Sequence, residues 1–309
     1  MILKLNWYFT VVLWVMLLCC GKELSPINKA ASQGNTLLIV PGSKVEKLAG
    51  GFMFTEGPAC DAEGNIYFSD IPNQRIYRWS VNGTLSLFLE NTEWANGLGF
   101  DGNGVLIACL ERGRALVSFD SRGNKTILAD IYDNKRLNST NDLWIDPDGG
   151  IYFTDPRYRI RPEQKLIGAM EQDGEHVYYL SWDRKNLTRV IDDLIRPNGI
   201  EGDNGRKRLY VIDNGANKTY MYTIKNNGIL NDKKLFTSKG GDGMTIDAEG
   251  NVYLTTGGVT IFNPDGVEIM NIKVPEQTSN VCFGGKYRQT LFITAGTSLY
   301  AIRMRMKGL

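Results

Sequence analysis

The sequence predicts an all-β protein, specifically a six-bladed β-propeller. The first observation is a unit of two apolar strands that recurs six times, at intervals of about 40 residues or somewhat more. The second is a D-x-x-G turn of the kind that joins antiparallel strands, which precedes several of the units. The third is the lack of any convincing amphipathic helix pattern. Repeated all-strand units of this length are typical of propeller blades with four strands each.

The strands are recognised by period-two alternation and by β-branched and aromatic residues. The first strand of each unit is expected at residues 66–70, 105–109, 151–155, 209–213, 252–256 and 291–295. A second strand is expected at residues 75–79, 115–119, 177–181, 219–223, 259–262 and 298–302. Because six units make a closed ring, we expect a strand at 37–40 or 45–48 to pair with the last blade and cover its edge.

The interval between the third and fourth units is the longest, and it contains an insertion at residues 157–175. Propellers carry function on the loops at one face of the central channel. This insertion is therefore the candidate lid.

Residues 1–20 differ from the rest of the chain. An apolar run from Trp7 to Leu18, too short to span a bilayer, is followed by Cys19 and Cys20. This layout resembles a bacterial lipoprotein signal, with an ordinary signal peptide or an uncleaved anchor as the alternatives. We expect a lipid on Cys19 or Cys20, a tether at 21–36, a propeller at 37–309, and export as a periplasmic or outer-membrane lipoprotein.

The charge is balanced, with 35 basic and 34 acidic residues. This balance argues against a nucleic-acid partner and against a polybasic membrane face, so membrane contact is expected only through the N-terminal lipid. Cys60, Cys109 and Cys282 lie in or beside strands and are expected to be buried free thiols, because a domain of this size can build a core without disulfides.

A polar residue stands just before the first strand of each unit. The six are Glu56, Asn96, Asn141, Asn198, Asp242 and Asn280. Since the innermost strand of every blade lines the channel, we expect these side chains to converge at one mouth. Carboxylates and amide carbonyls gathered without a basic residue favour a hard cation, Ca²⁺ before Mg²⁺ or Mn²⁺. The alternative is that Asn and Asp merely start strands by bonding to turn backbone.

Other motifs fail their structural context. Residues 97–102 match G-x-G-x-x-G but occupy a strand and a turn, so a dinucleotide site is not expected. His176 is the only histidine, which excludes His-rich zinc sites; it is either a strand-end residue or a proton carrier near the lid.

The motifs together resemble those of the gluconolactonase–regucalcin (senescence marker protein) family, in particular its bacterial gluconolactonase branch. They are FTEGP at 54–58, KRLNSTND at 135–142, YFTDP at 152–156, RPNG at 196–199, GDGM at 241–244 and SNVCFGG at 279–285. The resemblance implies a six-bladed propeller that hydrolyses sugar lactones and holds one divalent cation, usually Ca²⁺, with Mg²⁺, Mn²⁺ or Zn²⁺ as further candidates.

The same resemblance implies roles for individual residues. Glu56, Asn198 and Asp242 would hold the cation, with Asn141 adjoining the metal or its substrate, and Asp242 would activate the water. Two positions depart from the family pattern: Thr140 replaces the usual Pro, and Ser139 stands where regucalcin-like members place a substrate-binding Arg. Contacts to the substrate are expected from Asn96, Asn141, Arg136, Arg157, Tyr158 and Glu171.

We therefore expect a metal-dependent lactonase that acts at the channel mouth as a monomer or dimer. Two alternatives remain open. One is a lactonase or esterase for another substrate, and the other is a non-catalytic ligand-binding propeller.

Overall fold

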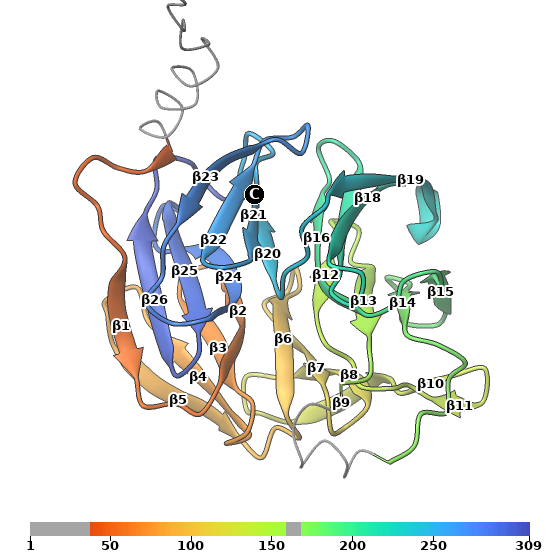
Figure 1. Ribbon diagram of the computed structural model, residues 1–309. Helices are drawn as coiled ribbons and strands as arrows, with labels where there is room; N and C mark the ends of the chain where they lie inside the picture. The colour runs from red at the N-terminus through yellow and green to blue at the C-terminus, as the bar shows by residue number, and fades with distance from the viewer. Residues whose placement is uncertain (1–37, 159–167) are drawn as a thin grey trace, which may run out of the picture.

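The structure is a computed structural model that describes residues 38–158 and 168–309. It consists of six four-stranded antiparallel sheets arranged as the blades of a propeller (Figure 1). The predicted all-β, six-bladed fold is confirmed. The signal segment with Cys19 and Cys20, and the whole of the tether, lie outside the described residues.

In each of blades 1 to 3 the chain adds four strands from the axis outward. Their strands are β2 (Thr55–Cys60), β3 (Ile66–Asp70), β4 (Arg75–Trp79) and β5 (Leu85–Glu90); β6 (Ala95–Phe100), β7 (Leu106–Leu110), β8 (Ala115–Phe119) and β9 (Lys125–Ala129); and β12 (Leu143–Ile145), β13 (Ile151–Asp155), β14 (His176–Leu180) and β15 (Leu187–Ile191). A small hairpin of β10 (Ile131–Tyr132) and β11 (Lys135–Arg136) links blades 2 and 3.

Blades 4 to 6 follow the same path. Their strands are β16 (Pro197–Asp203), β17 (Arg208–Asp213), β18 (Lys218–Ile224) and β19 (Leu230–Thr237); β20 (Met244–Ile246), β21 (Val252–Thr255), β22 (Val259–Phe262) and β23 (Glu268–Ile272); and β24 (Thr278–Gly284), β25 (Thr290–Ala295), β26 (Ser298–Arg303) and β1 (Glu46–Gly50). The short 3-10 helix η2 (Asn226–Gly228) joins β18 to β19.

The ring closes through the strand β1, which comes first in the chain and completes the last blade. It pairs antiparallel with β26, with Glu46 opposite Ala301 and Gly50 opposite Ser298 (Figure 1). Ile39 adds an isolated bridge to Met304. The predicted closure is confirmed, and the second of the two expected segments supplies the strand.

The D-x-x-G turns connect the inner strand of a blade to the next strand outward. In each turn the aspartate Oδ1 accepts the backbone N–H four residues later, at 2.8 Å from Asn65 to Asp61 and 2.8 Å from Gly150 to Asp146. Gly64 and Gly149 have φ values of 92° and 93° in these turns, a conformation that side chains with a Cβ rarely adopt.

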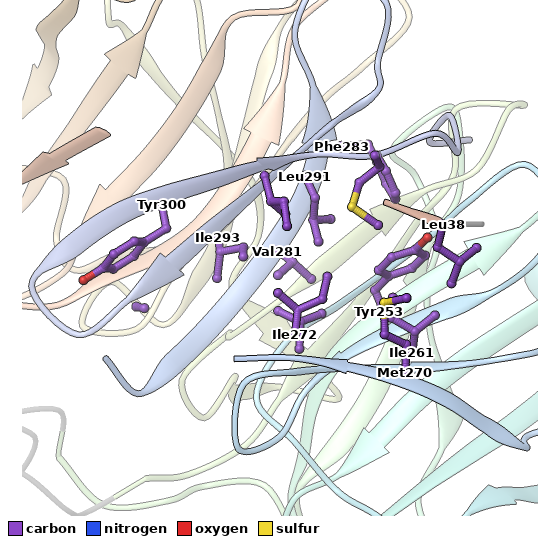
Figure 2. Close-up of a cluster of buried hydrophobic side chains, with 14 residues drawn as sticks. Leu38, Tyr253, Ile261, Met270, Ile272, Val281, Phe283, Leu291, Ile293 and Tyr300 are labelled. Carbon is purple, nitrogen blue, oxygen red and sulfur yellow. The ribbon is translucent and has the colours of Figure 1, made fainter. Parts of the chain in front are cut away.

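The apolar core lies between neighbouring blades. In the cluster of Figure 2, Val281 and Phe283 of β24 face Tyr253 and Ile261 of blade 5. The Tyr253 and Phe283 rings meet edge to face with their centroids 5.1 Å apart. Similar clusters fill the other blade-to-blade interfaces, so the blades hold one another around the axis.

The described residues include no helix long and apolar enough to cross a membrane. Cys60, Cys109 and Cys282 are free thiols as expected, although Cys60 is only partly buried.

Candidate functional site

The candidate site lies at the end of the channel where the inner strands begin, which we call the mouth. Here neighbouring blades are joined by backbone hydrogen bonds, from Gly97 N–H to Asn141 O at 2.8 Å and from Gly199 N–H to Asp242 O at 2.9 Å. The approach is close enough that a Cβ on Gly199 would stand 2.6 Å from the Asp242 carbonyl oxygen. Glycine after the polar residue is therefore what lets the inner strands meet around the axis.

The same hydrogen bonds show which residue of each blade occupies the equivalent place at the mouth. They correct one of the six polar residues predicted there. Gly243 N–H donates to Ser279 O at 2.8 Å, so Ser279 is the sixth equivalent of Asp242 and Asn141. Asn280 lies one level deeper, where its Nδ2 reaches Asp142 Oδ2 of the opposite blade at 3.4 Å. The expected position of Asn280 in the ring was wrong by one residue, because the hairpin of β24 and β25 is longer than that of β2 and β3, so spacing from the following strand misplaced the sixth residue.

Glu56 lies among other acidic groups at the mouth. Its side chain is buried, and its Oε2 accepts the Gly57 N–H at 2.9 Å. Burial first, and then the negative charges of Asp242, Asp142 and Glu111, raise the pKa of Glu56 well above its usual value. Burial likewise raises the pKa of Asp142 to about 7.

Two asparagines of the ring are each paired with a carboxylate. Asn198 Nδ2 donates to Asp242 Oδ1 at 2.6 Å, and Asn96 Nδ2 donates to Glu111 Oε1 at 3.0 Å. Because a carboxylate can only accept here, each amide presents its nitrogen to the acid and turns its carbonyl oxygen away from it. Asn141 is buried beside them, and its backbone N–H donates to Thr154 O at 2.9 Å.

This donor set fits a hard cation better than a soft one. Within residues 38–158 and 168–309, no three His, Cys, Asp or Glu side chains group closely enough to hold an ion by themselves. A cation at the mouth would thus need amide oxygens as well as carboxylates, which is the all-oxygen chemistry of Ca²⁺. Burial and the neighbouring carboxylates raise the pKa of Glu56. A cation at the mouth would therefore offset an unfavourable concentration of negative charge.

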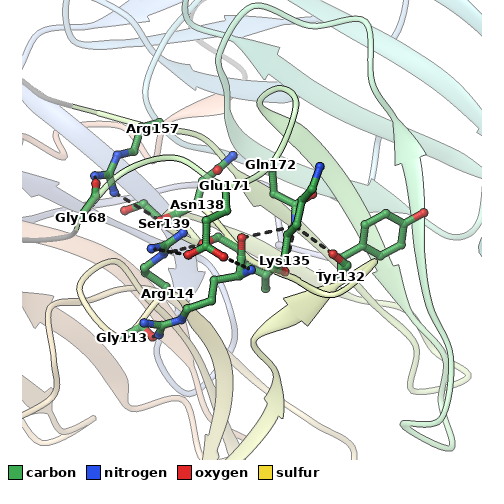
Figure 3. A network of polar contacts seen from close by, with 12 residues as sticks. Gly113, Arg114, Tyr132, Lys135, Asn138, Ser139, Arg157, Gly168, Glu171 and Gln172 are labelled. Carbon is green, nitrogen blue, oxygen red and sulfur yellow. Dashed lines mark hydrogen bonds and ion pairs between the residues drawn. The ribbon is translucent and has the colours of Figure 1, made fainter.

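Glu171 of the insertion lies beside Arg114 (Figure 3) and contacts Arg136 of β11, and both Glu171 and Arg136 were expected at the substrate. Glu171 Oε1 pairs with Arg114 Nη1 at 3.3 Å, and its Oε2 accepts the Arg136 backbone N–H at 3.0 Å. The Arg136 guanidinium donates to Gly113 O at 3.1 Å. Both side chains already have protein partners, and their contact with substrate stays a prediction.

Arg157 is buried under the same segment. Its Nη1 donates to Asn138 O at 3.4 Å, and its Nη2 contacts the Gly168 carbonyl (Figure 3). Residues 159–167 of the candidate lid lie outside the described part of the chain.

Tyr158 reaches the ring directly. Its hydroxyl oxygen accepts Asn198 Nδ2 at 2.7 Å. Burial, followed by the charge of Asp242, raises the pKa of Tyr158, so this hydroxyl keeps its proton. Of the residues expected from the insertion, Tyr158 is the one that the structure brings against a predicted cation ligand.

His176 does not belong to this group. It lies at the start of β14, with Nε2 3.0 Å from Asp173 Oδ1 and 3.2 Å from Arg189 Nη1. These contacts favour the strand-end interpretation of His176 over a proton carrier.

Sequence reasoning missed two acids. Asp142 directly follows Asn141, so its adjacency to the ring was a usable signal. Glu111 follows β7 at the mouth, and nothing in its local sequence marks it.

The comparisons with known proteins identify the family of this chain. Residues 54–297 match the family described as SMP-30/Gluconolactonase/LRE-like region. A gluconolactonase from Zymomonas mobilis is 29% identical over 320 residues, covering 93% of this chain and 88% of its own length.

Solved structures show the same likeness. A gluconolactonase structure from Xanthomonas campestris is 31% identical, covers 86% of this chain and 91% of its own, and superposes with a TM-score of 0.82. A calcium-binding protein, regucalcin, from Agrobacterium tumefaciens covers 87% of this chain and 95% of its own. With 18% identity and a TM-score of 0.72, it shows the shared fold alone. The chain is therefore a member of the SMP-30/gluconolactonase/LRE-like family.

Proposed function

We propose that this protein is a Ca²⁺-dependent lactonase that opens sugar lactones at the mouth of its central channel. The observation that carries the proposal is the meeting of Glu56, Asn198 and Asp242, from three different blades, at one end of the axis. Family membership supports a lactone-hydrolysing role, because its gluconolactonase relatives match most of the chain.

Glu56, Asn198 and Asp242 are the residues that would hold the cation, with Asn141 beside them. A bound Ca²⁺ supplies Lewis-acid chemistry, which polarises the lactone carbonyl and stabilises negative charge on its oxygen. Mg²⁺, Mn²⁺ and Zn²⁺ are the other ions to test. The pairing of Asn198 Nδ2 with Asp242 leaves the Asn198 carbonyl oxygen available for a cation.

Asp242 acts as the general base. Its carboxylate takes a proton from the water that attacks the lactone carbonyl, and Asn198 holds it in place at 2.6 Å. The ring C–O bond then breaks, and the released ring oxygen takes up the proton from Asp242, which gives a hydroxy acid. No histidine takes part, since His176 is held by contacts to Asp173 and Arg189.

Asn96 and Asn141 place amide groups at the mouth, and Tyr158 adds a protonated hydroxyl. These neutral donors and acceptors suit the hydroxyl groups of a sugar. Arg157, Arg136 and Glu171 are the remaining residues that we expect to bind the substrate.

The test is a pH-stat assay of acid release from a panel of aldonolactones, with and without a chelator. We expect release that stops with chelator and returns with added Ca²⁺. Hydrolysis that persists after complete cation removal would contradict the metal dependence. No release from any lactone, with cation bound, would favour a ligand-binding propeller.

We also propose export as a lipoprotein, on the basis of residues 1–20. Metabolic labelling with a radioactive fatty acid should label the wild type, and Cys19→Ser and Cys20→Ser should show which cysteine carries the lipid. Absence of label in the wild type would contradict the lipoprotein assignment.

A further inference from the structure

A continuous chain of contacts leads from the insertion to the ring of polar residues. It starts at Glu175, just before β14, whose side chain is 14% exposed. Glu175 Oε2 accepts the Arg157 backbone N–H at 3.0 Å and pairs with Arg196 Nε at 3.3 Å. The carboxylate thereby joins the insertion of blade 3 to the residue that precedes β16 in blade 4.

Arg196 continues the chain to Tyr158. Its guanidinium carbon stands over the Tyr158 ring at 5.2 Å from the centroid, a cation–π arrangement. The Arg196 backbone is itself fixed, because its N–H donates to Asp213 Oδ1 at 3.0 Å. The Tyr158 ring therefore packs against an arginine whose backbone position is fixed.

Tyr158 completes the chain at Asn198. Asn198 Nδ2 donates to the Tyr158 hydroxyl at 2.7 Å and to Asp242 Oδ1 at 2.6 Å. Both hydrogens of the amide nitrogen are thus accounted for by two acceptors on the same side. A flipped amide would place its carbonyl oxygen against the Asp242 carboxylate, so the nitrogen stays on this side and the carbonyl oxygen on the other.

We propose that Glu175, Arg196 and Tyr158 form a positioning relay that fixes the Asn198 amide with its carbonyl oxygen toward the cation. The relay rests on the proposed function, since it gives the insertion a part in cation binding. Outer contacts of this kind hold a ligating group in its binding orientation and save the cost of ordering it when the ion arrives. The three residues are positioning residues, because they act through Asn198.

The same insertion carries a second ion pair that makes a matched control. Asp173 Oδ1 pairs with Arg189 Nη1 at 2.7 Å and with His176 Nε2 at 3.0 Å, and these contacts do not lead to the ring. Asp173→Asn removes a charge from the same segment two residues before Glu175. It tests whether any lost carboxylate on the insertion has the same effect.

The experiment is calorimetric titration of the cation-free protein with Ca²⁺. We expect Tyr158→Phe to raise the dissociation constant about tenfold and Glu175→Gln about threefold, in line with other outer contacts to metal ligands. Asp173→Asn should bind like the wild type. Circular dichroism and the melting temperature of each cation-free variant show whether it is folded.

A double variant gives the sharpest outcome. If Glu175 acts through the Tyr158 hydroxyl, adding Glu175→Gln to Tyr158→Phe should leave the dissociation constant unchanged. Fully additive effects, or wild-type affinity in both folded single variants, would overturn the relay. A wild type that binds no divalent cation would instead refute the proposed function, so the two failures are distinguishable.

Discussion

The two ends of the central channel are built from the same six strands but differ in chemistry. At the mouth the strands present Glu56, Asn96, Asn141, Asn198 and Asp242, with Ser279 as the sixth member. Three residues further along, they line a cavity of about 200 Å³ at the opposite end. These lining residues are Ala59, Gly99, Trp144, Glu201, Thr245 and Cys282.

The difference shows that the polar ring is a local feature of the mouth and not a general property of the inner strands. Five of the six residues at the opposite end carry no charge, and Glu201 is the exception. Half-buried there, Glu201 accepts the Gly202 N–H at 3.0 Å, and burial raises its pKa to about 8. Variants at matched positions can therefore separate function at the mouth from structure at the opposite end.

The largest expected effect is on turnover. Asp242→Asn should lower kcat/KM for an aldonolactone by at least about a thousandfold, because an amide cannot accept the proton of the attacking water. Glu201→Gln, the matched change at the opposite end, should stay within about twofold of the wild type. Initial rates in a pH-stat, with folding checked by circular dichroism, measure both.

Comparable activity losses in the two variants would contradict the assignment of the reaction to the mouth. Wild-type turnover in Asp242→Asn would remove that residue from the mechanism.

The second effect is on cation binding. Ca²⁺ at about a hundredfold excess over its dissociation constant should stabilise the wild type by about 2.7 kcal/mol, a rise of about 5–8 °C in melting temperature. Glu56→Gln should lose most of this rise, because it replaces a charged ligand by a neutral one. Thermal unfolding with and without Ca²⁺ measures the difference, and an unchanged rise in Glu56→Gln would exclude this residue as a ligand.

The third effect is on packing around the axis. Gly199→Ala should destabilise the fold by about 2 kcal/mol, because its Cβ would press against the Asp242 backbone at 2.6 Å. Gly99→Ala at the opposite end meets the Leu143 Cδ1 at 2.7 Å, a flexible side-chain end that can move, and should cost less than about 1 kcal/mol. Urea unfolding of both variants measures the loss in free energy of unfolding at each end of the channel. A larger loss in Gly99→Ala than in Gly199→Ala would contradict the tighter packing at the mouth.

The smallest effect concerns pH. The pKa of Glu201 in the folded state, about 8, lies above its usual value of 4.5. Its contribution to stability is therefore fully present below about pH 4.5 and is lost as pH rises through about 8. The free energy of unfolding of the wild type should fall between pH 5 and 9, and Glu201→Gln should reduce this fall by on the order of 1–2 kcal/mol, after allowance for solvent screening.

Burial also raises the pKa of Asp142 and Asp155 to about 7. These two groups therefore lower the free energy of unfolding over the same pH range in the wild type and in Glu201→Gln. The informative quantity is thus the difference between wild type and Glu201→Gln in unfolding free energy at each pH. Parallel curves would contradict the raised pKa of Glu201.

The two middle strands of each blade could be predicted because they carry their own sequence signal. Alternation and β-branched residues located β3 and β13 to the residue, since their burial on both sides demands apolar side chains. The equivalence of the polar residues was predictable for five blades. It failed at Asn280, because the longer hairpin of β24 and β25 changes the spacing between the ring residue and the following strand.

The site was less predictable where it depends on contacts between loops. Glu111 meets Asn96 only because β7 ends beside the start of β6. The Arg196–Tyr158 contact joins residues from two blades, and neither residue stands in a repeating pattern. Such contacts depend on how neighbouring strands and blades are placed in the closed ring, so the local sequence does not indicate them.

The pairing of β1 with β26 has a consequence for how the molecule is made. Blade 6 takes its outermost strand from the start of the chain and its other three from the end. Blade 6 cannot form from β1 alone or from β24, β25 and β26 alone. During synthesis β1 therefore stays unpaired until β26 has left the ribosome. Bringing those distant segments together is a slow, entropically costly step. Once joined, β1 and β26 hold the ring of blades closed.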